Sequence, residues 1–390
     1  MTTKSAPPKS TAPHEKLIVL VLALAFVLGC RLLLYVWMPD RSSDFDLLYR
    51  SAALLVQGEN PYPPGLGWFP YPLPAVLLAV PFTWIPLALA RPVFDVLVGW
   101  AFVYALWKHR GLYALLALLS GTYLFAMANG QTTPLMVAAS LIPVLGFLLA
   151  AKPNTSAALW ISRPSWLAVL GVILALGLSL AVLPTWPRDW WMALPTDKAQ
   201  LAPPILRPLG FLLLLAAIRW RLPEGRLILA IAFIPQTTLP YELVPLALIP
   251  GNRLEMAVYV VGSWITVVAA DRLGVGQGMA QWAANGWPVT LAAVYAPMLY
   301  LVLRRGRRVS VAQKLEKERR RPHRIPDDEL RVDVNPKDDG GVTVTVTHLP
   351  TRLFSTESAP KRQQAERRAQ DKLAALVAEM ARRPDRAVNE

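Results

Sequence analysis

The chain has 390 residues, of which 54% are hydrophobic, and its mean hydropathy is +0.37. Apolar runs long enough to cross about 30 Å of hydrocarbon recur along it, so the composition is that of an integral membrane protein and excludes an ordinary soluble domain. The single Cys30 lies inside an apolar run, and the four histidines are scattered. The sequence therefore predicts neither a disulfide framework nor a cysteine or histidine metal site.

The net charge of +14 is unevenly distributed. From Arg304 onward there are 21 Lys and Arg against 14 Asp and Glu, so this tail contributes 21 − 14 = +7. Most of the remaining positive charge lies in loops between apolar runs, as the positive-inside bias of membrane proteins predicts. The basic total therefore follows mainly from topology and is weak support for nucleic-acid binding.

Residues 1–16 are rich in Pro, Ser and Thr, which predicts a disordered cytoplasmic N-terminus. The apolar run 17–37 is predicted to be the first span; a cleavable signal peptide is disfavoured because the run is long and further spans follow. An interfacial segment is expected at 73–90. Nine further spans are expected at 93–107, 111–128, 133–150, 166–183, 204–218, 227–239, 241–250, 256–270 and 288–303.

This pattern predicts an all-α polytopic membrane protein of about ten transmembrane helices, with both termini cytoplasmic. The basic clusters fall on one side of this arrangement, and the tryptophans fall at helix ends, as interfacial aromatic belts do. The weakest part is 227–250, because one continuous span there would place the tail outside. By the same topology Lys152 is expected on the cytoplasmic side, which argues against a role for it in an outer site.

The loop 38–74 between the first two apolar segments carries the strongest functional pattern. Asp44 and Asp46 flank Phe45, a short helical segment follows, and Asn60-Pro61-Tyr62 and Tyr71-Pro72 force an extended, turning chain. A plain connector needs only a few polar residues. A long, proline-stiffened, aromatic loop indicates a surface that holds a ligand at the membrane edge.

The run from Asp44-Phe45 through Tyr49, Asn60-Pro61-Tyr62 and Tyr71-Pro72 resembles the signature loop of glycosyltransferase family 87, whose members are multispan enzymes of the GT-C type. Weaker matching pieces follow, and together they cover roughly the first two thirds of the chain: Gly130-Gln131, Lys152-Pro153, Pro184-Thr185-Trp186 and Pro240-Tyr241-Glu242. The resemblance implies a hexosyltransferase, with mannose the expected sugar. It would use a polyprenyl-phosphate sugar as donor, no further cofactor and no metal, and a glycolipid or polysaccharide acceptor on the outer face of the membrane.

The position that matches the family's catalytic aspartate is Asp44, with Asp46 as the alternative. Either aspartate also suits the N-cap of the helix that follows. The substrate is expected to contact Tyr49, Asn60, Tyr62, Tyr71, Gln131, Tyr241 and Glu242. The donor phosphate is expected at Arg188 and Arg207, because the guanidinium fork suits phosphate oxygens, although ordinary interfacial snorkelling is the favoured explanation for either arginine taken alone.

Residues 304–390 predict a small α+β cytoplasmic domain. Alternation from Val342 indicates a strand, and 361–383 an amphipathic helix with Ala365, Ala369, Leu373, Leu376 and Met380 on one stripe. Together with Glu329–Val332 and the run His348-Leu349-Pro350-Thr351, the tail resembles the catalytic domain of peptide chain release factors, but without the glutamine of the Gly-Gly-Gln loop. The resemblance implies lost hydrolysis, with RNA or ribosome contact remaining. Packing on the membrane domain or binding of anionic lipid is the equal alternative.

The sequence therefore predicts a multi-pass glycosyltransferase of the bacterial plasma membrane. The alternatives are a transporter and a membrane anchor that carries an RNA- or ribosome-binding tail. Neither alternative requires Asp44.

Overall fold

The structure is a computed structural model of the chain. It describes residues 43–63, 71–194, 202–237, 239–274, 285–305, 327–337 and 341–381, together with residue 21 and residues 25–29. The chain divides into two compact units, Met1–Gly306 and Arg307–Glu390. The predicted boundary at 303/304 lies close to this division. The predicted first span and the N-terminal segment lie mostly outside the described residues.

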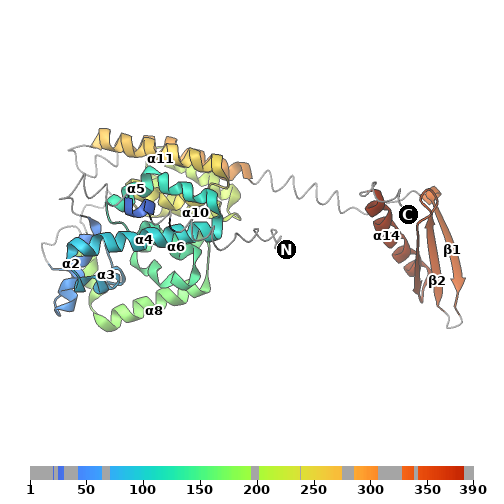
Figure 1. Cartoon of the computed structure of the whole chain (residues 1–390), viewed down its shortest axis with the longest axis horizontal. Coiled ribbons are helices and arrows are strands. Elements are labelled where there is room, and N and C mark those ends of the chain that lie inside the picture. The colour runs from blue at the N-terminus through green and yellow to red at the C-terminus, as the bar shows by residue number, and fades with distance from the viewer. Residues whose placement is uncertain are drawn as a thin grey trace. The chain divides into compact units, whose positions relative to one another are not determined.

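The first unit is built from α-helices and short 3-10 helices (Figure 1). Its α-helices are α2 (Asp44–Val56), α3 (Leu73–Ala79), α4 (Leu87–Arg110), α5 (Gly121–Ala128), α6 (Thr133–Leu141), α7 (Pro153–Ser162), α8 (Trp166–Val182), α9 (Trp186–Ala193), α10 (Pro223–Phe233), α11 (Arg253–Gly274) and a last helix at Asn285–Arg305. The 3-10 helices are η1 (Val80–Trp84), η2 (Leu112–Leu119), η3 (Pro143–Ala151), η5 (Pro204–Leu206), η6 (Gly210–Arg219) and η7 (Pro240–Leu248). The last helix contains a π-helical turn at Leu291–Tyr295.

Two helices in the described part are long and apolar enough to cross a membrane, Leu87–Arg110 and Asn285–Arg305. The pair Trp166–Val182 and Trp186–Ala193 adds a third if it counts as one span, although it bends by 94°. The helical character and the presence of apolar helices of spanning length are thus as predicted. By length and composition, however, the described helices provide two or three spans where about ten were expected.

The difference arises because several apolar runs are interrupted. The predicted span 111–128 divides at Ser120, whose hydroxyl accepts the backbone N–H of Tyr123 and so starts α5 as a new helix. The predicted span 133–150 divides at Ile142, where extended backbone and the following Pro143 end α6. Run length predicts how much apolar chain is present, whereas these caps and prolines decide whether it forms one helix.

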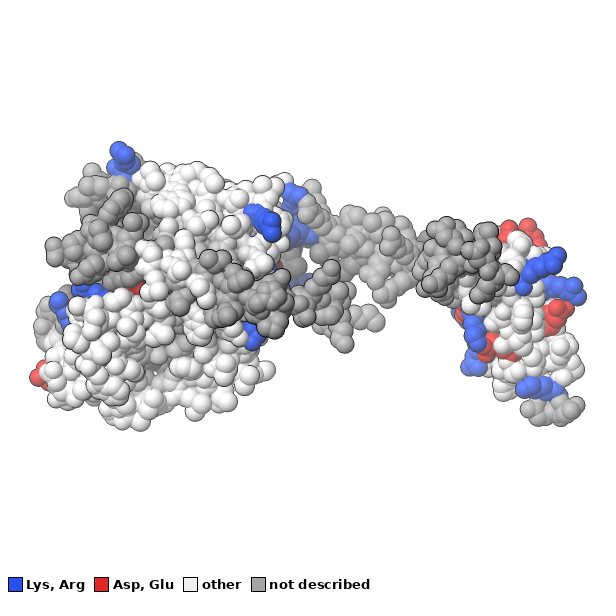
Figure 2. All heavy atoms as spheres, viewed as in Figure 1, with Lys and Arg blue, Asp and Glu red and all other residues white. Residues whose placement is uncertain are grey.

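Helix α8 exposes most of its apolar surface. Only Ala168 and Ser179 of its 17 residues are buried, and Leu167, Leu174 and Leu178 are each about 60% exposed. An apolar helix this exposed requires an apolar environment, because water would be an unfavourable solvent for it. Figure 2 shows the same property more widely, since the visible face of the first unit is largely free of charged atoms between its ends.

The second unit is a three-stranded antiparallel sheet with one helix against it. The strand order is β1 (Leu330–Pro336), β2 (Val342–His348), β3 (Phe354–Ala359), and α14 (Arg362–Ala381) packs on β2 and β3. Val344 and Val346 meet Ala365, Ala369 and Leu373 in a separate small core. The strand from Val342 and the C-terminal helix are therefore confirmed, but Leu376 is 41% exposed and lies off the predicted apolar stripe.

Candidate functional site

Asp44 is the first residue of α2, and the loop before α6 holds its backbone. Its N–H donates to the carbonyl of Asn129 at 2.9 Å. The adjoining Gly130 has a φ of +60°, and a Cβ there would approach Ser43 and Phe45 to about 3.0 Å. A residue without a side chain is therefore needed where this turn touches the start of α2.

The Asp44 carboxylate accepts two side-chain hydrogen bonds on one oxygen. The Tyr71 hydroxyl donates to Oδ2 at 2.7 Å, and the Gln131 amide nitrogen donates to the same oxygen. Burial raises the pKa of Asp44 above its usual value, while Tyr71, Lys152 and Gln131 oppose that rise. Burial and the Asp44 charge also raise the pKa of Tyr71, which keeps its phenol protonated as a donor.

A second set of polar groups continues from Gln131. Lys152 Nζ donates to Gln131 Oε1 at 3.2 Å and to Thr133 Oγ1 at 2.8 Å, and it lies 3.2 Å from Glu242 Oε1. The other Glu242 oxygen accepts from the Thr155 hydroxyl at 3.1 Å. Lys152 is 7% exposed and Glu242 6% exposed. Asp44 and this buried ion pair are therefore joined through the single amide of Gln131.

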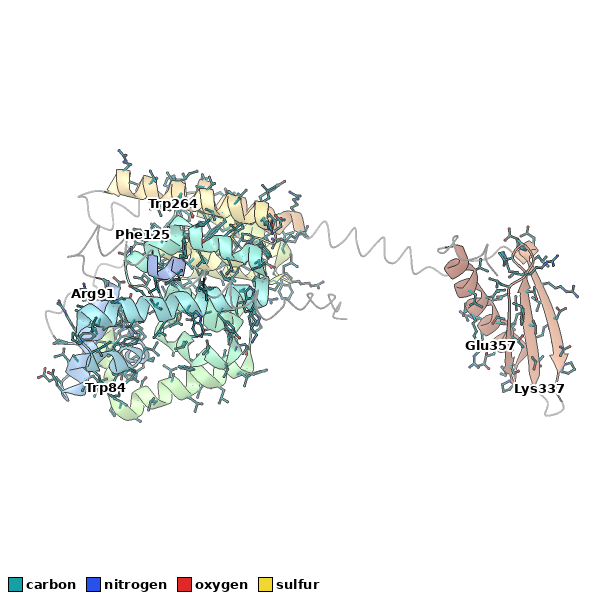
Figure 3. All side chains as sticks on the ribbon, viewed as in Figure 1. Trp84, Arg91, Phe125, Trp264, Lys337 and Glu357 are labelled. Atoms are coloured by element: carbon teal, nitrogen blue, oxygen red, sulfur yellow. The ribbon has the colours of Figure 1, made fainter. Side chains whose placement is uncertain are left out.

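An aromatic side chain borders the ion pair. Lys152 Nζ lies 4.8 Å from the centroid of the Tyr241 ring, close enough for a cation–π contact. The Tyr241 ring in turn stacks on Phe125, with a centroid distance of 6.1 Å. Figure 3 labels Phe125 on this part of the first unit. We call the cluster of Asp44, Tyr71, Gln131, Lys152, Tyr241 and Glu242, with Thr133 and Thr155, the polar network.

Asp46 has a different role. Its carboxylate accepts from the Ser43 N–H at 3.0 Å and the Ser43 hydroxyl at 2.8 Å, which completes a capping box at the start of α2. The guanidinium of Arg91, which Figure 3 labels, donates hydrogen bonds to both oxygens of the Asp46 carboxylate. The predicted N-cap role of Asp44 or Asp46 is therefore wrong, because Ser43 is the N-cap. Phe45 between the two aspartates stacks on Phe94, with 4.3 Å between the ring centroids.

The structure brings together five of the predicted site residues, namely Asp44, Tyr71, Gln131, Tyr241 and Glu242. Two others support the loop from outside the network: Asn60 accepts the Tyr62 N–H at 2.9 Å, and the Tyr62 hydroxyl donates to the Tyr71 carbonyl at 3.4 Å. The Tyr49 hydroxyl donates to the Ile85 carbonyl at 2.9 Å, so it ties α2 to the chain after η1.

The two arginines predicted for the donor phosphate lie outside the polar network. Arg188 is exposed on α9, whose Asp189 accepts a hydrogen bond from Asn60 at 3.3 Å. Arg207 donates to the Ala202 carbonyl at 3.2 Å, and its guanidinium lies 5.9 Å from the Trp287 ring centroid. Within the described residues, the lysine of the polar network is the cation that influences Asp44.

Lys152 is the residue that sequence reasoning excluded. A membrane-crossing segment 133–150 would separate Gln131 from Lys152 by about 30 Å of hydrocarbon. The side chains instead meet at 3.2 Å, so the predicted placement of Lys152 on the opposite side from Gln131 is wrong. The short helices α6 and η3 reverse the direction of the chain, so that Lys152 returns to the neighbourhood of Gln131. The match of Lys152-Pro153 to the glycosyltransferase pattern was the available sequence signal for this residue. The predicted topology argued against it.

The described residues contain no group of three or more His, Cys, Asp and Glu side chains arranged to hold a metal ion. Comparison with known proteins gives no match: no family model, no curated protein and no solved structure is similar to this chain. The functional argument therefore rests on the polar network itself.

Proposed function

We propose that the chain is a polytopic membrane glycosyltransferase of the GT-C type, which transfers a hexose, with mannose the expected sugar, from a polyprenyl phosphate to a glycolipid or polysaccharide acceptor outside the cytoplasm. About ten spans, both termini in the cytoplasm and a location in the bacterial plasma membrane belong to this proposal. The observation that carries it is the polar network, in which the Asp44 carboxylate and the buried ammonium of Lys152 both bind the side-chain amide of Gln131.

Asp44 is proposed as the general base. In the transfer, the acceptor hydroxyl loses its proton to the Asp44 carboxylate, its oxygen bonds to the anomeric carbon, and the bond from that carbon to the phosphate oxygen breaks. A raised pKa makes the carboxylate a stronger base, and Tyr71 and Gln131 fix its direction. One carboxylate suffices for an inverting transfer, and Asp46 is already held by Arg91.

Lys152 is proposed as the group that receives the leaving phosphate, in addition to the arginines expected from the sequence. Its ammonium is held by Glu242 and Gln131 in the structure. A phosphate brought next to Asp44 would offer it a second anion, and an ammonium placed where negative charge develops stabilises the transition state. Tyr71 and Tyr241 place buried aromatic rings beside these groups.

The test is a transfer assay with the purified full-length chain in lipid nanodiscs. Polyprenyl-phosphate mannose with a radiolabelled sugar is the donor, and a membrane extract supplies acceptors. The expected result is a labelled product that depends on the chain. If no polyprenyl-phosphate sugar is consumed by the wild-type chain under conditions where it is folded, the enzyme proposal is wrong.

A transporter is the second candidate, because one observation favours it. The Lys152–Glu242 pair is buried among interrupted helices, and intramembrane ion pairs beside broken helices are typical of transport sites. The two candidates differ at Asp44. Sugar-phosphate uptake into sealed vesicles that persists in Asp44→Asn, with no transfer product in the wild type, would favour the transporter.

A further inference from the structure

Several helices of the first unit end together at the opposite end of α4 from Arg91 (Figure 3). Arg110 follows Arg91 by nineteen positions, which corresponds to about 28 Å of helix, close to the thickness of a hydrocarbon core. At the far end, charged groups from α4, α10, α11, the last helix and the α7–α8 connection gather. We call them the inner cluster: Arg110, Arg163, Arg226, Arg305, Glu224 and Glu255.

Most of the inner cluster is paired. Glu224 lies 3.8 Å from Arg110 and 3.5 Å from Arg305, and Arg305 also pairs with Glu255 at 2.6 Å. Arg226 donates to the last carbonyls of α7, including that of Ser162 at 2.8 Å. Four guanidinium groups nevertheless share two carboxylates, so the cluster carries an uncompensated positive charge.

Arg163 is the arginine of the inner cluster that takes part in none of these contacts. It is half-buried, and its Nε atom is buried without a hydrogen-bond partner in the part of the chain that the structure describes. Burial and the neighbouring Arg110 lower its pKa, whereas Glu224 opposes that effect. A buried donor beside like charges is costly unless an anion satisfies it.

An apolar pocket of about 330 Å³ lies between α7 and α8. Its lining includes Trp160, which precedes Arg163 by three residues in the sequence. One face of α7 lines it from Pro153 to Trp160, a length of about 10 Å. The facing wall comes from α8, at Ala168, Val172 and Ile173. Ile173 is 58% exposed, so the pocket reaches the exposed apolar surface of α8.

From this juxtaposition we infer that the chain holds a structural anionic phospholipid of the bilayer, with its headgroup phosphate on Arg163 and Arg110 and one acyl chain in the pocket between α7 and α8. The planar guanidinium offers paired donors to phosphate oxygens, and the headgroup would supply the missing negative charge. This inference requires the unit to lie in a membrane but does not depend on transferase activity.

A bilayer lipid fits this pair of features better than a free phosphate, because a free phosphate would leave the apolar pocket empty. A bilayer lipid also fits better than the polyprenyl chain of a sugar donor whose phosphate is bound by Lys152. In that case Arg163, at the other end of the ten-residue α7 from Lys152, would remain unpaired.

The test measures lipid retention by native mass spectrometry of the full-length chain after titration with phosphatidylglycerol or, as the neutral comparison, phosphatidylcholine. We expect one phosphatidylglycerol to be retained preferentially. Arg163→Gln should weaken its binding by roughly tenfold, because a charge-assisted contact is lost. Ala157→Phe, which fills the pocket from an exposed position on α7, should also weaken it.

Arg221→Gln is the matched control, because it removes an exposed arginine that lies over Trp220 and does not line the pocket. It should leave retention unchanged. Equal loss in this control, or equal retention of phosphatidylcholine, would overturn the inference. Displacement of the lipid by millimolar inorganic phosphate would show a free-anion site instead. Displacement by polyprenyl phosphate that depends on Ala157 but not on Arg163 would assign the pocket to the donor.

Discussion

Replacing Asp44 and Asp46 separately, each by Asn, should produce opposite defects. Asp44 accepts hydrogen bonds from Tyr71 and Gln131, whereas Asp46 completes the capping box of α2 and binds Arg91. Both changes are isosteric and lie two residues apart. A difference between them therefore reports the role of each carboxylate rather than a general disturbance of the loop.

Asp44→Asn should lower the rate of transfer by about 10²–10⁴-fold, which is the usual contribution of a positioned base. It should not lower stability. Burial raises the pKa of Asp44 above its usual value of 3.8, so the folded state binds this proton more tightly than the unfolded state does. Ionisation of Asp44 therefore lowers the free energy of unfolding progressively as the pH rises from the pKa of this carboxyl in the unfolded chain to its raised pKa in the folded chain. A neutral amide at this position removes that loss of stability.

Asp46→Asn should retain the chemistry but destabilise the fold by roughly 2–4 kcal/mol, because it breaks a charge-assisted pair with Arg91 and leaves that guanidinium partly buried. The assays are transfer from polyprenyl-phosphate mannose at saturating donor and thermal unfolding of the same samples. Near-full activity in Asp44→Asn would refute its assignment as the base. Loss of activity without loss of stability in Asp46→Asn would show that the two roles are exchanged.

Three further predictions address the rest of the chain. Lys152→Met should reduce transfer by at least tenfold and leave Glu242 buried without its ion-pair partner, whereas Arg207→Met, which removes a cation near Trp287, should have the smaller effect on transfer measured in the same assay. In a Cys30→Ser background, an impermeant thiol reagent should label Ser42→Cys but not Ser358→Cys, an exposed position on β3, in intact cells; equal labelling would contradict the topology. Deletion of 307–390 should leave the first unit folded, since the tail has its own core, and the isolated tail should not hydrolyse peptidyl-tRNA; degradation of the shortened chain would show that the tail is structural.

The sequence alone was enough to predict a candidate functional stretch, because its pattern is local. Asp44, Tyr71, Gln131, Tyr241 and Glu242 were all predicted, and the structure gathers them in one network. The strand from Val342 and the amphipathic C-terminal helix were also predictable, since side-chain periodicity of two or of 3.6 residues follows directly from backbone geometry.

Tertiary structure alone decided which aspartate faces the network. That choice depends on Arg91, which is 45 residues away and captures Asp46. It also decided the place of Lys152, because the length of an apolar run does not reveal whether Ile142 interrupts it. Composition determines how much of the chain avoids water, whereas caps, prolines and long-range ion pairs determine where each apolar segment turns and which charges meet.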